Sequence, residues 1–133
     1  MTESRVALDT WAWWEVLKGS RVGATLRDRY ILHGGARPIT SAISLGEVSA
    51  KLTAQGSELQ VPITVASIRH RSEIVDVSSE IAVEAGVLRR ELRNAAEDAS
   101  LADAIVLITA RRSGVRLVSM DKAFRGQPDV LRS

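Results

Sequence analysis

Four acidic residues with apolar sequence around them stand at widely separated points of the chain: Asp9, Glu47, Asp103 and Asp121. We call these four residues the acid cluster. A carboxylate removed from water needs a compensating cation, and four carboxylates brought together need at least one divalent metal ion. The chain has no cysteine, and His33 and His70 lack the spacing of a ligand pair, so oxygen ligands favour Mg²⁺ or Mn²⁺ over zinc. The acid cluster therefore predicts a metal-dependent enzyme that acts on phosphate esters.

Structural uses of the same acids have to be weighed against this chemistry. Asp9 can cap the helix expected after it, and Asp121 can cap a short helix over residues 122–124. Asp103 is harder to explain in this way, because it is the only polar residue between positions 101 and 108. An unpaired carboxylate buried in such a helix costs on the order of several kcal/mol.

The helix expected around Glu47 carries two apolar stripes. Leu45, Val48 and Leu52 form one stripe, and Glu47 falls on the other among small and apolar residues. The polar side chains of this helix are expected on a different arc: Ser44, Lys51 and Gln55. Glu47 should therefore be partly buried.

Apolar runs, capping residues and glycines divide the chain into alternating strands and helices. We expect strands over residues 5–9, 37–40, 73–77 and 115–118, the second of them edge-like or terminal. We expect helices over residues 10–18, 22–32 (ending before Gly34 and Gly35), 41–55 and 62–70, a helix that starts at Ser78 or Ser79 and ends near residue 94, and a helix that starts at Asp98 or Ser100 and ends near residue 112. This alternation predicts an α/β fold around a mostly parallel sheet, whose ligands bind beyond the carboxyl ends of the strands. Asp9 and Asp121 each follow a strand and should lie there.

Length and composition limit the class of protein. The 133 residues fit a single domain spanning 1–133, and the absence of cysteine is compatible with a reducing compartment. The apolar run at the N-terminus is too short for a signal peptide, and no stretch is long enough to span a bilayer. We therefore expect a cytoplasmic protein with no membrane partner.

The charge balance is weakly informative about a nucleic-acid partner. The chain has 18 basic and 16 acidic residues, and fifteen of the basic residues are arginine, which binds phosphate in a bidentate manner. With the acid cluster sequestered by metal, 18 basic residues face 12 acidic ones, which would attract a polyanion. An arginine-rich composition without functional meaning explains the count equally well.

Other catalytic motifs are absent from the sequence. No glycine-rich phosphate loop, reactive cysteine or nucleophile elbow occurs. Asp9 is followed by Thr10 and Trp11, so the Asp-x-Asp pattern of phosphatases that form an aspartyl phosphate is missing. Trp11, Trp13 and Trp14 can stack on bases, line a groove for a partner, or pack internally; we expect packing and partner contact.

Four segments together resemble the PIN domain, and more narrowly the toxin ribonucleases of VapBC toxin–antitoxin pairs. They are Leu8-Asp-Thr10, the segment 40–48 with Glu47, the segment 101–110 with Asp103, and Leu117-Val-Ser-Met-Asp121-Lys-Ala-Phe124. Their order and spacing cover the chain almost from end to end. The resemblance implies a three-layer α/β/α fold, endonucleolytic cleavage of RNA with Mg²⁺ or Mn²⁺, homodimers or a higher complex, and neutralisation by a small antitoxin protein.

The resemblance also implies roles for individual residues. Asp9 and Asp103 would hold the main metal ion, and Glu47 and Asp121 would complete its shell or bind a second ion. Thr10 and Ser119 would position water or substrate, although Thr10 can equally serve as a cap. Two alternatives stay open: a PIN-like nuclease with a housekeeping or DNA-directed role, and a non-catalytic PIN-like scaffold.

Overall fold

Five short segments pair as the strands of one sheet in the computed structural model, which describes residues 5–33 and 35–132. The strands are β1 (Val6–Leu8), β2 (Ile39–Ser41), β3 (Glu73–Val75), β4 (Arg116–Val118) and β5 (Val130–Leu131). Their order is β3-β2-β1-β4-β5, and every neighbouring pair is parallel. The predicted α/β fold is confirmed, with a sheet that is parallel throughout the described strands.

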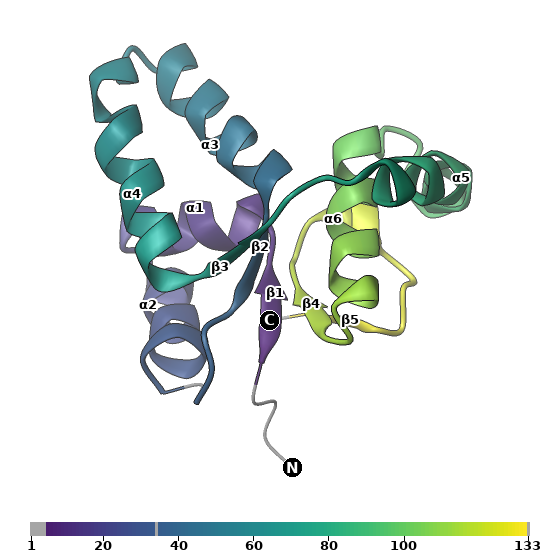
Figure 1. The fold of residues 1–133 in the computed structure, drawn as a ribbon, viewed down its shortest axis with the longest axis horizontal. Coiled ribbons are helices and arrows are strands. Elements are labelled where there is room, and N and C mark those ends of the chain that lie inside the picture. The colour runs from purple at the N-terminus through teal and green to yellow at the C-terminus, as the bar shows by residue number, and fades with distance from the viewer. Residues whose placement is uncertain (1–4, 34, 133) are drawn as a thin grey trace.

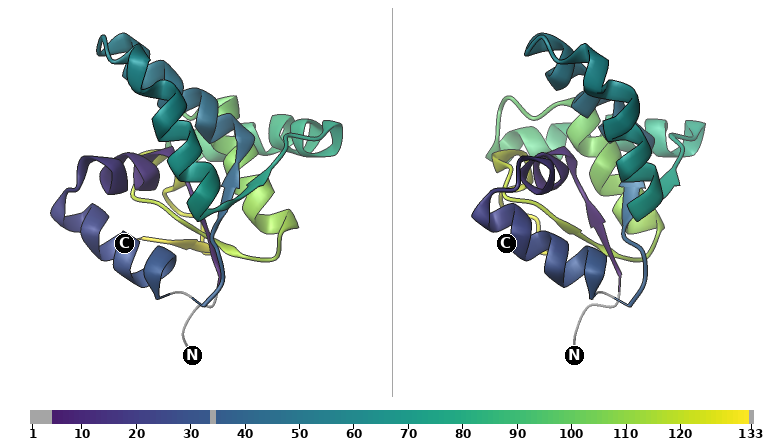
Figure 2. Two further views of the ribbon diagram at one scale, coloured as in Figure 1. Left: turned by 60° about the vertical axis from the view of Figure 1, so that its left-hand side comes forward. Right: turned by 90° about the vertical axis from the view of Figure 1, so that its left-hand side faces the viewer.

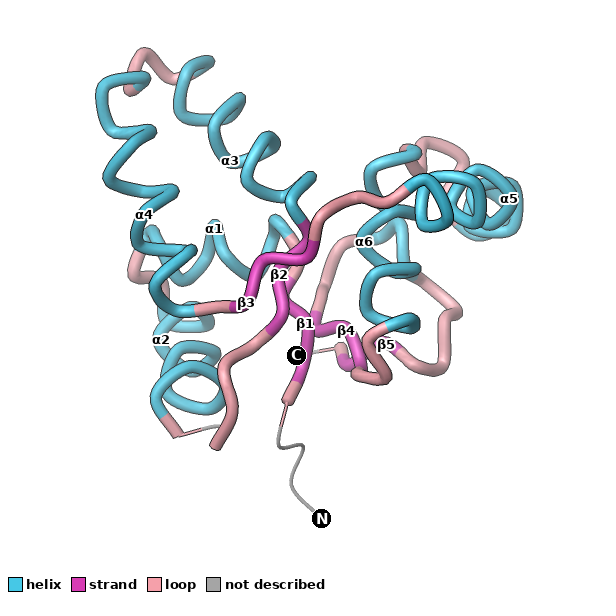
Figure 3. The backbone as a smooth tube through the Cα atoms, in the orientation of Figure 1, coloured by secondary structure: helices cyan, strands magenta, loops and turns pink. Residues whose placement is uncertain are grey.

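Helices cover both faces of this sheet, as Figures 1 and 2 show. One group comprises α1 (Thr10–Lys18), α2 (Arg21–Leu26), the π-helical turn η1 (Arg27–Leu32), α3 (Ala42–Ala54) and α4 (Val61–Arg71). The other comprises α5 (Ser79–Ala95) and α6 (Leu101–Arg112). Two 3₁₀ turns, η2 (Glu58–Gln60) and η3 (Lys122–Phe124), complete the elements. The strands are short relative to the helices around them (Figure 3).

The alternation of side chains along β1 separates two hydrophobic cores. Val6 and Leu8 pack with the helices α1 to α4, whereas Ala7 packs with α5 and α6. Successive side chains of a strand point to opposite faces of the sheet, so a central strand that is apolar at every position serves both layers. The expected three-layer α/β/α arrangement follows.

Capping residues set most helix boundaries where the sequence predicts them. The side chains of Asp9, Ser41, Ser78 and Ser100 each accept a hydrogen bond from the first turn of α1, α3, α5 and α6, respectively. Gly19 ends α1 with a left-handed φ of 69°. Gly34, expected at the end of the second helix, lies outside the described residues.

Three features of the fold differ from the sequence-based expectation. β2 is not an edge strand, because β1 and β3 flank it on either side. β5 was not predicted, since two residues after Pro128 carry no periodic pattern. Ser44, expected on a polar arc, is buried with 1% of its surface exposed.

The strand order places a topological switch point at the centre of the sheet. From β1 the chain moves outward through β2 to β3, then crosses to the other side of β1 to form β4 and β5. The connections that leave β1 and β4 therefore run in opposite directions, which opens a crevice at their carboxyl ends. Asp9 follows β1 directly, and Ser119 follows β4.

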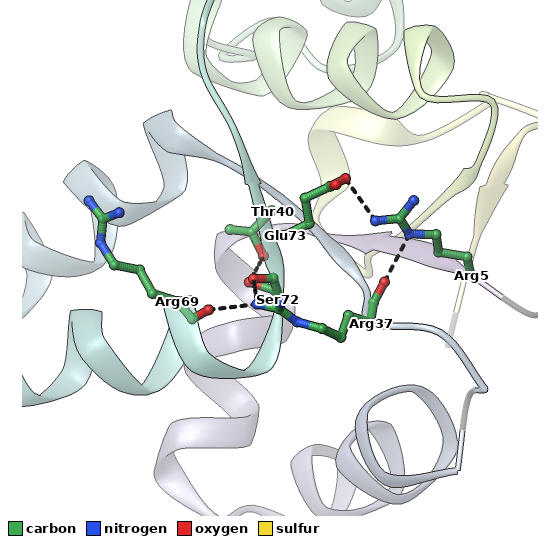
Figure 4. A network of polar contacts seen from close by, with 6 residues as sticks. All are labelled: Arg5, Arg37, Thr40, Arg69, Ser72 and Glu73. Atoms are coloured by element: carbon green, nitrogen blue, oxygen red, sulfur yellow. Dashed lines mark hydrogen bonds and ion pairs between the residues drawn. The ribbon is translucent and has the colours of Figure 1, made fainter.

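Polar contacts hold the connection from α4 to the edge strand β3 against the segment that precedes β2 (Figure 4). Arg37 donates to the carbonyl oxygens of Arg69, at 2.8 Å, and Ser72, at 2.5 Å. Arg5 donates to the carbonyl oxygen of Arg37 and pairs with Glu73 at 2.7 Å.

Within the described part of the chain, no helix has both the length and the hydrophobicity needed to cross a bilayer.

Candidate active site

A cavity of about 570 Å³ opens at the carboxyl ends of β1 and β4, where the switch point predicts a ligand site. All four residues of the acid cluster line it. They come from four different parts of the fold: the end of β1, helix α3, helix α6 and the loop after β4. The remaining lining residues are Thr10, Trp11, Trp14, Glu15, Lys18, Ala50, Lys51, Val106 and Phe124.

Asp9 is the most deeply buried acid of the cluster, with 3% of its surface exposed. Its Oδ1 accepts from the backbone N–H of Ala12 at 2.8 Å, and its Oδ2 accepts from the hydroxyl of Ser119. Burial raises the pKa of Asp9 to about 7, and the negative charges of Asp121 and Asp103 add to this rise, against the two hydrogen bonds. Asp9 is thus both the predicted N-cap and part of a group of mutually repelling carboxylates.

Glu47 reaches the cavity from the middle of α3 and is half-buried, as its position on an apolar stripe predicts. Its Oε1 accepts from the Thr10 hydroxyl at 2.5 Å. Burial raises the pKa of Glu47, and Asp103 and Asp121 raise it further, while Thr10 and Lys51 act in the opposite direction. The Thr10 hydroxyl therefore orients the Glu47 carboxylate rather than capping α1.

Asp103 has a structural role that the sequence analysis missed. Asp103 is the third residue of α6, and its Oδ2 accepts a hydrogen bond from the backbone N–H of Ser100 at 2.8 Å. In return, the Ser100 hydroxyl accepts a hydrogen bond from the backbone N–H of Asp103. This reciprocal pair is a capping box, and the spacing Ser-x-x-Asp was the available signal. Burial still raises the pKa of Asp103 despite these bonds.

Asp121 caps the short turn η3, as the sequence predicts, through an Oδ1 that accepts from the N–H of Ala123 at 2.9 Å. Its own N–H donates to the Ser119 hydroxyl at 2.9 Å. The Ser119 hydroxyl therefore joins Asp9 and Asp121 at the ends of β1 and the β4 loop. This residue was singled out from the sequence, but its contact with Asp9 was not.

The donor set suits a hard divalent cation. No lysine or arginine among the described residues forms an ion pair with a carboxylate of the acid cluster, and carboxylate oxygens are the ligands that Mg²⁺ and Mn²⁺ prefer. In residues 5–33 and 35–132 no three acidic or histidine side chains are drawn together into a ready metal site. Each carboxylate instead accepts a hydrogen bond from a backbone N–H or from a side-chain hydroxyl.

The aromatic and basic residues of the cavity were only partly anticipated. Trp13 is fully buried and donates through Nε1 to the Thr40 hydroxyl at 2.8 Å, so it belongs to the core. Trp11 and Trp14 line the cavity on the α1 side. Neither of the cavity lysines, Lys18 and Lys51, was identified from the sequence as a site residue. Both histidines are exposed, as expected.

The family described as the PIN domain matches residues 6–129 of this chain. No curated protein sequence is significantly similar to it. Among solved structures, a toxin–antitoxin complex from Klebsiella pneumoniae superposes with a TM-score of 0.71 at 23% identity, over 96% of each chain.

Two further structures share the fold over similar lengths. VapBC2 from Rickettsia felis, bound to a DNA fragment from its promoter, gives a TM-score of 0.72 at 20% identity over 96% of each chain. VapC20 from Mycobacterium tuberculosis, a toxin that cleaves the sarcin–ricin loop, gives a TM-score of 0.67 at 19% identity, over 96% of this chain and 99% of the VapC20 chain. At such identities the likeness is one of fold.

Proposed function

This chain belongs to the PIN domain family, and from that premise we propose that it is a divalent-metal-dependent endoribonuclease and the toxin of a type II toxin–antitoxin pair. The observation that carries the proposal is the acid cluster: four carboxylates from four parts of the fold line one cavity at the switch point of the sheet. A scaffold without catalytic function has no use for carboxylates such as Asp9 and Glu47, whose pKa values are raised by burial and further by neighbouring acids.

We propose that Asp9 and Asp103 hold the principal cation, Mg²⁺ or Mn²⁺, and that Glu47 and Asp121 complete its surroundings. When bound, such a cation supplies positive charge beside the scissile phosphate and makes a water molecule more acidic. The four bare carboxylates would otherwise repel the phosphate. The acid cluster is therefore proposed as both the catalytic and the metal-binding set.

The neighbouring hydroxyls act through the carboxylates. Ser119 donates to Asp9, and Thr10 donates to Glu47, so each fixes the direction in which its carboxylate presents its remaining lone pairs. Thr10 lines the cavity directly and is also placed to contact water or a phosphate oxygen. Removing either hydroxyl should disorder a carboxylate without changing the charge of the site.

Expression of wild type and Asp103→Asn from a tightly controlled promoter tests the activity, with growth and total RNA followed together. The amide keeps the volume of Asp103 and an acceptor for Ser100, so the variant should fold. We expect growth arrest with discrete new RNA ends for wild type only. Asp28→Asn, an exposed acid on η1, is the matched control and should behave as wild type. Equal RNA cleavage by Asp103→Asn would contradict the assignment.

The same purified proteins distinguish the alternative activities. Incubation with Mg²⁺ or Mn²⁺ and either RNA or single-stranded DNA should give carboxylate-dependent cleavage of RNA. Cleavage confined to DNA would favour the DNA-directed PIN nuclease. Intact RNA and DNA, with no effect on growth, would favour the non-catalytic scaffold.

We further propose that a small antitoxin protein neutralises this chain and that the toxin forms homodimers or a higher complex with it. Support comes from the solved structures of similar fold, among them the toxin–antitoxin complex from Klebsiella pneumoniae and the VapBC2 complex from Rickettsia felis. Co-expression of a neighbouring short reading frame should restore growth. Light scattering of the purified chain, alone and with that product, should give the mass of a dimer and of a larger complex.

A further inference from the structure

Two lysines line the active-site cavity, and they have different partners. Nζ of Lys18 forms an ion pair with Oε2 of Glu15 at 2.8 Å, one turn earlier on α1. Nζ of Lys51 lies 4.9 Å from the centroid of the Trp14 ring. Within the described part of the chain, Lys51 makes no ion pair, and none of the arginines lines the cavity. Lys51 is therefore the one cavity cation not already neutralised by a carboxylate in salt-bridge contact.

Lys51 does not form an ion pair with the acidic residue that precedes it by one turn of α3. Glu47 and Lys51 are four residues apart on α3, the spacing at which Glu and Lys pair on a helix surface. The Oε1 of Glu47 is instead taken by the Thr10 hydroxyl, and the Lys51 ammonium lies over the indole of Trp14. A neutral aromatic ring attracts a cation without cancelling its charge. The contact thus holds at the cavity wall a positive charge that attracts the Glu15 and Glu47 carboxylates without forming an ion pair with either, and that remains available to a ligand.

The walls of the cavity differ in the charge and polarity of their side chains, so they should contact different parts of a bound substrate. The wall built by α1 and α3 carries Lys51, the two tryptophans Trp11 and Trp14, and the Glu15–Lys18 ion pair, whereas α6 and η3 contribute the apolar residues Val106 and Phe124. The acid cluster lines the same cavity and repels phosphate until a cation is bound. Among the described residues, Lys51 on the α1–α3 wall is the cavity-lining cation that is free of an ion pair and can contact a phosphodiester chain.

We infer that Lys51, held on the Trp14 ring, is a substrate-positioning residue that contacts a backbone phosphate of single-stranded RNA bound in the cavity. The inference rests on the proposed ribonuclease function. It assigns the α1–α3 wall to the backbone of the bound strand. Trp14 then acts through Lys51 by keeping the ammonium directed into the cavity.

Binding of a fluorescent pool of short random-sequence RNAs to Asp103→Asn protein, which should not cleave and whose cavity carries one repelling carboxylate fewer, tests this contact. Anisotropy titrations over a range of salt give the slope of log affinity against log salt. Loss of one phosphate contact in a single strand changes this slope by about 0.7. We expect Lys51→Ala to weaken binding several-fold at low salt and to flatten the slope by that amount.

Three further variants in the same background separate positioning from general charge. Lys18→Ala combined with Glu15→Gln removes the neighbouring cavity lysine together with the carboxylate that neutralises it, so affinity and slope should be unchanged. Lys51→Arg should restore the slope, because arginine also stacks on aromatic rings. Trp14→Leu should weaken binding while retaining most of the slope.

The outcomes distinguish this inference from the proposed function. An unchanged slope for Lys51→Ala, or an equal loss for the double variant of Lys18→Ala and Glu15→Gln, would overturn the role of Lys51 while RNA cleavage by wild type still stands. Absence of RNA binding by every variant, together with absence of cleavage by wild type, would overturn the ribonuclease proposal and this inference with it. Lys51 is exposed, so equal thermal midpoints should show that its variants fold.

Discussion

At the scale of single residues, the site is a set of acids held by short-range polar partners. Ser119 is fully buried, and its hydroxyl donates a hydrogen bond to Asp9 and accepts one from the backbone N–H of Asp121. One hydroxyl therefore sets the geometry of two carboxyl-bearing residues that are far apart in sequence. Buried polar groups are costly unless each is satisfied, which makes this contact sensitive to substitution.

Ser119→Ala should lower the cleavage rate by roughly 10- to 100-fold, the range measured when residues that orient metal ligands are removed. The N–H of Asp121 would also lose its acceptor, at a cost of about 1–3 kcal/mol in the free energy of unfolding. Single-turnover cleavage and urea unfolding measure the two effects. Ser119→Thr keeps the hydroxyl and should retain most of the rate; equal defects in both variants would show that packing, and not the hydroxyl, matters.

The buried Asp9 makes the stability of the metal-free protein depend on pH. Its pKa is about 7 in the folded chain and 3.8 for the ordinary group, so the folded state binds the proton more tightly than the unfolded state. The free energy of unfolding should therefore fall as pH rises from 4 to 7, by up to about 4 kcal/mol, and level off above. Urea unfolding in the presence of a chelator measures this dependence.

Asp9→Asn provides the control for that pH dependence. The amide has no proton to lose, so the decline in this window should be much smaller even if absolute stability differs. Glu47 and Asp103 also have raised pKa values and leave a residual slope of the same sign. Parallel curves for wild type and Asp9→Asn would contradict the assignment of the slope to Asp9.

At the scale of elements, local signals explain which parts of the fold were predictable. Helices α1, α3, α5 and α6 begin at capping residues that the sequence displays, and β1 and β4 are apolar runs before a polar residue. β5 has two residues and is defined by its pairing with β4, a long-range contact that the local sequence pattern does not predict. The interior place of β2 is likewise a property of strand order.

The site was predictable in its acids and less so in its surroundings. Each acid interrupts an apolar run, which is a local signal. The contacts Ser119 to Asp9, Thr10 to Glu47 and Lys51 to Trp14 join different elements, or depend on side-chain direction, and leave no trace in spacing. The capping box at Asp103 was readable from sequence, because Ser100 precedes it by three residues.

The close approach of α1 and α2 gives a prediction at this scale. A Cβ atom added at Gly23 would lie 1.9 Å from the carbonyl oxygen of Glu15, which is backbone and cannot rotate away. Gly23→Ala should therefore destabilise the protein by at least about 3 kcal/mol, measured by urea unfolding. Gly86 on α5 has open space around it, so Gly86→Ala should instead stabilise by about 0.5–1 kcal/mol. Equal effects would contradict the packing argument.

At the scale of the whole molecule, the sheet and both helical layers meet at the cavity. β1 contributes Asp9, α3 contributes Glu47 from one layer, α6 contributes Asp103 from the other, and the loop after β4 contributes Asp121. The two hydrophobic cores lie on opposite faces of the sheet and are otherwise separate. A cation shared by these acids would therefore join parts of the fold that hydrophobic packing alone leaves divided.

Binding of a divalent cation should consequently raise the stability of the entire chain. At a concentration of about 100 times the dissociation constant, binding adds about 2.7 kcal/mol, a rise in the thermal midpoint on the order of 10 °C. The rise should be larger at pH 8 than at pH 5, because the cation competes with the proton on Asp9. Thermal unfolding with Mg²⁺ or Mn²⁺ measures it. Asp28→Asn should retain the shift and Asp103→Asn should lose most of it, whereas equal shifts in both would place the bound ions outside the acid cluster.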